Sequence, residues 1–126
     1  MRALRIPLFV LLLLLAVCIC STVRMDIICH RWAQELERTQ IAVEKYDFDA
    51  ADEALRELEE DWAHWQTYLH ITIEHGEIDQ AQELLDLCRL QVDEMDTPAF
   101  LIAATRLQGQ LDLLREMEKL SIKNIL

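Results

Sequence analysis

Residues that break helices are scarce in this sequence. Its 126 residues include two glycines, Gly76 and Gly109, and two prolines, Pro7 and Pro98. A glycine-rich loop that cradles phosphate is therefore excluded. Because no glycine or proline lies between Pro7 and Gly76, we expect long, uninterrupted helices in the first half of the chain.

Residues for nucleophilic catalysis are equally scarce. The chain has only two serines, Ser21 and Ser121, and its four cysteines lie in apolar runs or stripes, where a thiol usually serves as a small buried hydrophobe. No CxxC or paired zinc-ligand spacing occurs outside the apolar N-terminal run. We therefore expect no catalytic residue, no cofactor and no enzymatic activity. Cys29 and Cys88 lie on different predicted helices, and whether they form a disulfide stays open.

Positive charge is in the minority. There are 12 lysines and arginines against 23 aspartates and glutamates, so the formal net charge is −11, and about −13 when Arg2 and Arg5 at the N-terminus are set aside. A surface of this sign repels phosphate backbones and anionic headgroups, so we expect no nucleic-acid partner. Attraction of divalent cations or of a basic partner is one interpretation, and an ordinary solvated surface is the other.

One long hydrophobic run is present at the start of the chain. Ile6–Val23 carries no charge, and Arg24 follows it directly. As a helix the run reaches roughly 27 Å, which is close to the thickness of a bilayer core and longer than the apolar part of an ordinary cleaved signal. We interpret it as a retained transmembrane helix. A cleaved signal peptide and a lipoprotein signal ending at Cys18 are the alternatives.

The charges beside this run predict its orientation. Arg2, Arg5 and the amino terminus precede the run, whereas Arg24 after it is offset by Asp26. The positive-inside bias therefore places residues 1–5 in the cytoplasm and residues 24–126 outside, in a single-pass protein of the cell membrane. About a hundred residues suffice for one modest core, so we expect residues 24–126 to form one acidic domain.

The part of the chain after the run has helical periodicity and almost no strand signal. We expect helices over about 24–46, 49–74, 78–95 and 98–120, each with an apolar stripe at intervals of three and four residues. Short connections force neighbouring helices to be antiparallel. The predicted fold is all-α, with an N-terminal transmembrane helix continuous with an antiparallel, up-and-down bundle of about four helices. The stripes comprise Met25, Ile28, Trp32, Leu36, Val43 and Tyr46; Ala51, Leu55, Leu58, Trp62, Trp65, Leu69 and Thr72; Ile78, Ala81, Leu85, Cys88, Val92 and Met95; and Phe100, Ala104, Leu107, Leu111 and Leu114.

Local signals mark the middle of the chain. Asp47 or Asp49 is expected to cap the second helix, and Gly76 is expected to stop it. Asp79 with Gln82 three residues later resembles a capping box, which predicts the start of the third helix there.

The fourth helix has a clear start and an unusual interior and end. Thr97 followed by Pro98 predicts an N-cap and a first helical residue. Gly109 interrupts the helix, which indicates a tight crossing with another helix or plain tolerance. The apolar segment Leu120–Leu126 is expected to dock back onto the bundle, the alternative being contact with another surface.

The richest polar segment lies between the second and third helices. His70 and Glu74 share one helical face four residues apart, and His75 and Glu77 follow. A zinc site needs three or four ligands, and the usual helical pair of histidines at i and i+4 is absent. These four residues are therefore weak metal candidates, and the alternative is a polar corner whose side chains make hydrogen bonds between helices.

Three features together resemble a known family. They are the basic start with one apolar span, the segment Trp65–Asp79 with its sequence His75-Gly76-Glu77-Ile78-Asp79, and the ending Leu120-Ser121-Ile122-Lys123-Asn124-Ile125-Leu126. The chain resembles the single-span bacterial membrane proteins grouped as domain of unknown function 4363, which are common in anaerobic Gram-positives. The resemblance covers nearly the whole chain. It implies a membrane-tethered helical domain that accompanies larger membrane proteins, and no catalytic residue carries over.

These observations favour a binding protein over an enzyme. We predict an uncharacterised, membrane-anchored helical protein that acts as an interaction or accessory subunit at the outer face of a bacterial membrane. A larger membrane protein or a second copy of the chain is the expected partner. The alternative is an extracytoplasmic sensor of a metal or small ligand that uses the corner formed by His70, Glu74, His75 and Glu77.

Overall fold

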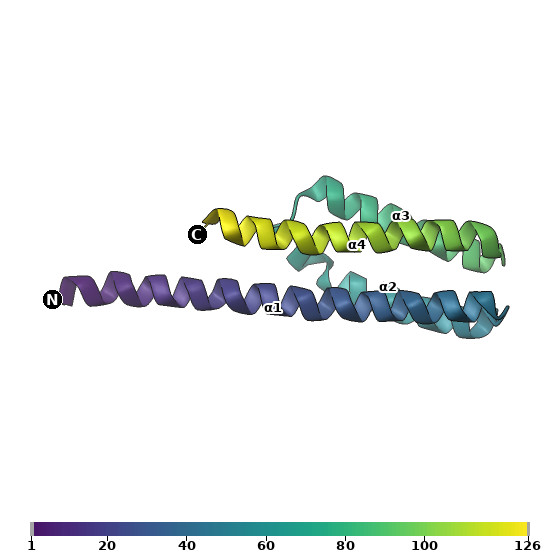
Figure 1. Ribbon diagram of the computed structural model, residues 1–126, viewed down its shortest axis with the longest axis horizontal. Helices are drawn as coiled ribbons and strands as arrows, with labels where there is room; N and C mark the ends of the chain where they lie inside the picture. The colour runs from purple at the N-terminus through teal and green to yellow at the C-terminus, as the bar shows by residue number, and fades with distance from the viewer. Residues whose placement is uncertain (1, 126) are drawn as a thin grey trace.

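Four helices make up the structure, which is a computed structural model (Figure 1). It describes the backbone of residues 2–125 and the side chains of residues 3–71, 73–120 and 123. The described backbone contains no strand, and short connections make consecutive helices antiparallel, so the predicted all-α bundle is confirmed. The helices are α1 (Arg2–Glu44), α2 (Phe48–Thr72), α3 (His75–Asp93) and α4 (Thr97–Ile125).

Each helix packs against two neighbours. α1 contacts α2 and α4, and α3 contacts the same two helices, so the four form a closed ring around one core. We call the end of the bundle with the α2–α3 connection, residues 73–74, the proximal end. The distal end carries the other two connections, residues 45–47 and 94–96. Figure 1 shows α4 continuing past the α2–α3 connection, and the N-terminal part of α1 extending alone beyond the end of α4.

The predicted transmembrane helix and the first bundle helix are one continuous element. α1 runs unbroken through the position of Arg24, because no helix breaker follows Pro7 until Gly76. The helix begins at Arg2, so Pro7 lies inside it rather than at its start, where its missing N–H removes a single backbone hydrogen bond. α1 is long and apolar enough to cross a membrane, and none of its most apolar window is buried in the protein.

The core lies where the apolar stripes meet. Trp32, Leu36 and Phe100 are fully buried, and nearly all predicted stripe residues are buried with them. Trp65 is only half-buried and packs on the edge of this core. The side chain of Thr72 is not among those described. Tyr46 and Met95, in contrast, are 74% and 64% exposed, so their placement on the stripes was wrong.

Tyr46 and Met95 leave the stripes because each terminates its helix. Both have φ of 58°, in the left-handed region that a non-glycine residue adopts at some cost. The backbone then turns back on itself: Asp47 N donates to Ala42 O, and Asp96 N donates to Gln91 O. These are the reversed hydrogen bonds of a Schellman-type helix end.

The residue after each turn caps the next helix. Asp47 Oδ1 accepts from Ala50 N and Asp96 Oδ1 accepts from Ala99 N, both at 3.1 Å. The predicted cap at Asp47 is therefore confirmed, whereas Asp96 and not Thr97 caps the fourth helix. The two turns lie 49 positions apart in the sequence, and the α1–α2 and α3–α4 hairpins are built on the same turn.

The third helix starts earlier than predicted. α3 begins at His75, so Gly76 and Asp79 lie inside it, and its N-cap residue Glu74 makes no capping side-chain hydrogen bond. The capping box at Asp79 and Gln82 was wrong because Gln82 is used between helices: its Oε1 accepts from Trp62 Nε1 at 2.7 Å.

The unusual features of the fourth helix have separate outcomes. Gly109 is exposed, and a Cβ added there would meet nothing within 4 Å, so no tight crossing within the described chain requires it. α4 continues to Ile125, past the predicted end at residue 120. Most of the predicted docking of Leu120–Leu126 lies outside the described side chains, and Leu120 itself is 57% exposed.

Candidate functional site

The proximal end brings together two of the four predicted metal candidates. His70, near the end of α2, and His75, at the start of α3, face each other with Nδ1 atoms 2.7 Å apart and ring centroids 4.8 Å apart. One Nδ1–H donates to the other Nδ1, which requires at least one neutral ring. The pair therefore links the ends of α2 and α3 by a hydrogen bond between helices.

Glu74 and Glu77 do not complete a metal site with this pair. Glu74 is exposed, and Glu77 is turned toward α4, where Gln110 Nε2 donates to its Oε2 at 2.8 Å and to its backbone oxygen at 2.9 Å. No group of three or more histidine, cysteine, aspartate or glutamate side chains within the described residues has the arrangement of a metal site. The geometry of this corner is that of a polar helix connection.

A second polar cluster lies deeper at the same end. The Ser21 hydroxyl on α1 contacts the Tyr68 hydroxyl on α2 and donates to Glu118 Oε1 on α4 at 3.1 Å. Glu118 is only 4% exposed although it is a carboxylic acid. Three helices thus meet through polar atoms, and Ser21 belongs to the predicted span, so the bundle begins before the apolar run ends.

An open groove runs along α1 beside this cluster. One hollow of about 640 Å³ is lined by Val23, Arg24 and Ile27 of α1 and by Trp65 of α2. The Arg24 guanidinium lies over the Trp65 ring, 5.8 Å from its centroid. The ring is in turn held edge-on by Tyr68, with centroids 5.9 Å apart. The groove therefore combines an apolar wall with a cation fixed on an aromatic face.

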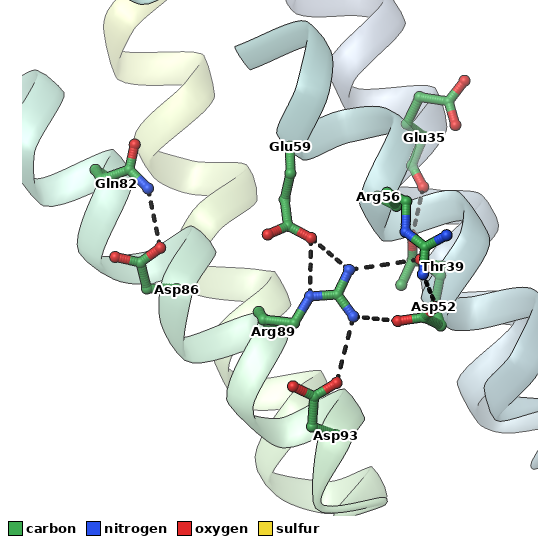
Figure 2. A network of polar contacts seen from close by, with 9 residues as sticks. All are labelled: Glu35, Thr39, Asp52, Arg56, Glu59, Gln82, Asp86, Arg89 and Asp93. Atoms are coloured by element: carbon green, nitrogen blue, oxygen red, sulfur yellow. Dashed lines mark hydrogen bonds and ion pairs between the residues drawn. The ribbon is translucent and has the colours of Figure 1, made fainter. Parts of the chain in front are cut away.

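The largest charged network lies away from the proximal end, between α2 and α3 (Figure 2). Arg89 Nε donates to Glu59 Oε1 at 2.8 Å, and its Nη atoms contact Asp52, Glu59 and Asp93. Burial by itself would lower the pKa of Arg89, but the hydrogen bonds that Arg89 donates to Glu59 and Asp52 raise it above its ordinary value. Because three carboxylates already surround Arg89, the network joins helices and is not an anion site.

The thiols are separate and unpaired. Cys29 and Cys88 are buried free cysteines on α1 and α3, so the open question of a disulfide is answered by two reduced thiols in the structure. Burial raises the pKa of each thiol from 9.0 to about 12. Neither is ionised near neutral pH, which is the chemistry of core residues and not of nucleophiles.

Sequence reasoning missed Glu118, Arg24 with Trp65, and Arg89. Glu118 did have a signal, because the spacing of Leu107, Leu111 and Leu114 continues to position 118 and places it on the buried stripe. The other two depend on which faces of neighbouring helices meet, and no short-range pattern carries that information.

The comparisons with known proteins identify one family. The model of the domain of unknown function DUF4363 matches residues 20–125. No curated protein and no solved structure matches the chain. The matched segment starts within the apolar run and includes the polar cluster at Ser21, Arg24 with Trp65, and nearly all of the bundle.

Proposed function

The chain belongs to the DUF4363 family, and from this premise we propose that it is a non-enzymatic accessory protein anchored at the outer face of a bacterial membrane. The observation that carries the proposal is the continuity of α1 from Arg2 to Glu44. Its N-terminal part projects alone beyond the end of α4, and the rest of the helix packs against α2 and α4 as a wall of the bundle. Anchor and domain are then mechanically one piece.

The exposure pattern supports membrane insertion of the projecting part. All large apolar side chains from Leu4 to Val17 except the partly buried Leu15 are about half or more exposed, which water would disfavour over several turns. A lipid bilayer accepts such a surface, because a helix satisfies its backbone hydrogen bonds internally. The same pattern fits a signal sequence, so retention of the segment has to be tested directly.

Orientation follows from the charges that flank the run. Arg5 lies before it, whereas Arg24 after it is followed by Asp26, which pairs with Lys119 at 4.0 Å. With the N-terminus in the cytoplasm, the acidic bundle stands on the outer face within a few nanometres of the bilayer. A partner there would meet the exposed face of α4 that carries Ile102 and Leu113.

Orientation and retention are tested in intact cells. A variant with its cysteines replaced, an N-terminal tag and Lys45→Cys at the distal end is treated with a membrane-impermeant maleimide. We expect labelling without permeabilisation and a full-length tagged product in the membrane fraction. Labelling only after permeabilisation would reverse the orientation, and loss of the tag from the bundle would show a cleaved signal.

The accessory role is tested by crosslinking in living cells. A photoreactive amino acid at Ile102 is expected to capture an integral membrane protein, whereas the same group at Glu37, which is exposed on α1, serves as the matched control. Capture that does not differ between the two positions, or a free monomer at both, would argue against a partner on α4.

A sensor function remains the second candidate because the structure brings His70 and His75 together. Two nitrogens fall short of a zinc coordination sphere, so a ligand or a second chain would have to complete it. A native-state ligand at a hundredfold its dissociation constant adds about 2.7 kcal/mol of stability. Thermal unfolding with and without zinc measures this, with His75→Gln as control, and an absent shift would retire the sensor.

A further inference from the structure

We propose that the groove beside Trp65 binds a phospholipid, with the lipid phosphate at Arg24 and an acyl chain along the apolar face of α1. The inference rests on the proposed insertion of α1 in a membrane. It adds a specific ligand class and a specific site to that function. The residues that carry it are Arg24, Trp65 and Tyr68, together with the α1 face from Ala16 to Val23.

Two hollows join to make this groove. Both are lined by Cys20 and Arg24, so they adjoin at the last turn of the apolar run. The smaller, of about 470 Å³, reaches toward the N-terminus to Ala16 and Val17, and the larger continues along α1 toward the bundle. The groove is therefore continuous with the apolar surface of the projecting part of α1, which is where an acyl chain would lie.

The charge of the groove differs from that of the molecule. The formal net charge is −11, yet the exposed Arg24 has no ion pair with any described residue. Arg31 at the far end is neutralised by Asp61, which accepts from its Nε and Nη2 at 2.9 Å each. The acidic neighbour Asp26 pairs instead with Lys119 of α4. Arg24 is thus the unneutralised cation of the groove, and a phosphate diester is its complement.

The aromatic residues place Arg24 at the depth of the headgroups. Trp65 and Tyr68 have apolar rings and polar tips, and such residues concentrate at the boundary of membrane and water. Contact with the Trp65 ring holds the guanidinium at this level, which lowers the ordering cost of binding an anion. When the lipid phosphate lies beside Arg24, its acyl chain extends along α1 toward Ala16.

A lipid fits the groove better than a helix of another protein does. An apolar helix would fill the apolar part but leave Arg24 desolvated without an acceptor, which is costly. A phospholipid carries its phosphate and its chain in the order in which Arg24 and the apolar face occur along α1. A second copy of the chain is disfavoured by charge, because each copy carries a formal net charge of −11 and the two acidic surfaces repel.

The test uses the full chain in vesicles with Trp65 as the reporter. Trp32→Phe and Trp62→Phe remove the other two indoles, and quenching of Trp65 is measured with brominated phosphatidylglycerol in phosphatidylcholine and the reverse mixture. We expect about fivefold tighter binding of phosphatidylglycerol than of phosphatidylcholine beside Trp65, the effect of about one basic residue. In Arg24→Gln this ratio falls to about one.

Arg38→Gln is the matched control, because it removes the same charge from an arginine that pairs with Glu35 and Glu57 away from the groove. It should retain the fivefold ratio. A ratio of one in the parent, or the same loss in both arginine variants, would overturn the lipid site while membrane insertion stands. Quenching that falls as the protein-to-lipid ratio rises would show a second copy in the groove and equally overturn it.

The two proposals fail in distinguishable ways. No quenching of Trp65 by either lipid would mean that the chain is not inserted, which removes the proposed function. If the double tryptophan variant does not fold, native mass spectrometry of the unmodified chain in detergent replaces it. Retained phosphatidylglycerol is then expected in the unmodified chain, with at least a threefold loss in Arg24→Gln and none in Arg38→Gln, and equal retention in all three would overturn the site.

Discussion

Trp32 of α1 and Trp62 of α2 lie with their ring centroids 5.2 Å apart and their planes at 58°. Each indole N–H has a partner at 2.7 Å: Trp32 Nε1 donates to Asp61 Oδ2, and Trp62 Nε1 donates to Gln82 Oε1 on α3. Both rings are almost fully buried. The pair therefore joins three helices by packing and by directed hydrogen bonds at once.

Truncation of this pair should destabilise the bundle strongly. Trp32→Ala or Trp62→Ala is expected to lower the free energy of unfolding by about 3 to 5 kcal/mol, because each leaves a large cavity and removes a hydrogen bond between helices. Trp65→Ala should cost about 1 to 2 kcal/mol, since its ring is only half-buried. Denaturant unfolding of the full chain in detergent measures all three. Equal costs at the three positions would contradict the deeper burial of Trp32 and Trp62.

Glycine at the two distal turns should stabilise the protein. Tyr46 and Met95 have positive φ and largely exposed side chains, so Tyr46→Gly and Met95→Gly relieve backbone strain with little loss of packing. After the larger entropy of glycine in the unfolded chain is deducted, about 0.5 to 1 kcal/mol of stabilisation is expected for each. Glu37→Gly, in the exposed interior of α1, should instead cost about 1 kcal/mol. Thermal unfolding shows whether each variant is stabilised or destabilised.

Removal of the Arg89 side chain should cost more than removal of any exposed arginine. Arg89→Met leaves Glu59 and Asp93 without a cation among the described residues and leaves Asp52 with Arg56 alone, and we expect a loss of about 2 kcal/mol or more. Arg56→Met is the control: its guanidinium pairs only with Asp52 among the described residues and is mostly exposed, so at most about 0.5 kcal/mol is expected. Arg89→Lys should recover only part of the lost stability. It restores the positive charge, but an ammonium lacks the planar fork that bonds two carboxylates at once. Urea denaturation compares the three.

The buried thiols should resist alkylation until the chain unfolds. Since the pKa of Cys29 and of Cys88 is raised to about 12, little thiolate is available at pH 8. We expect iodoacetamide to modify neither residue in folded protein, and to modify an exposed thiol introduced by Lys45→Cys within minutes. Mass spectrometry of peptides locates the adducts. Rapid labelling of Cys88 would contradict its burial in the α3 stripe.

The same raised pKa values predict how stability changes in alkali. Between about pH 9 and pH 12 the unfolded thiols ionise while the folded ones keep their protons, so the unfolded state is favoured increasingly as pH rises. The stabilising effect of the raised pKa is complete below pH 9 and is lost through this window. A variant with Cys29→Ala and Cys88→Ala should show a shallower decline of melting temperature with pH.

Local sequence information was enough to predict the four helices, but it misplaced several of their ends. The stripes through Trp32, Leu55 and Leu107 identified four helices, because burial of one face repeats every three to four residues. The start of α3 was misassigned because Gln82, read as a capping side chain, contacts Trp62 instead. At Thr97 a genuine helix start was displaced by one residue, since Asp96 supplied the cap.

The candidate site was less accessible to sequence than the fold. The polar corner was recognised, but that His70 meets His75 while Glu77 turns to Gln110 depends on how α2, α3 and α4 are placed. A one-dimensional pattern assigns a residue to a face of its own helix. It does not say which residue of another helix lies opposite.

The amino-acid sequence by itself determined that the chain is helical, that it carries an N-terminal apolar run, and that this run and the first bundle helix are continuous, because periodicity and the absence of breakers act within one helix. Only the tertiary structure decided that Ser21 contacts Tyr68 and Glu118. It also decided that Arg24 lies over Trp65 without a carboxylate partner among the described residues and that three carboxylates surround Arg89. Those contacts join residues far apart in the chain. Their geometry arises from the packing of four helices together.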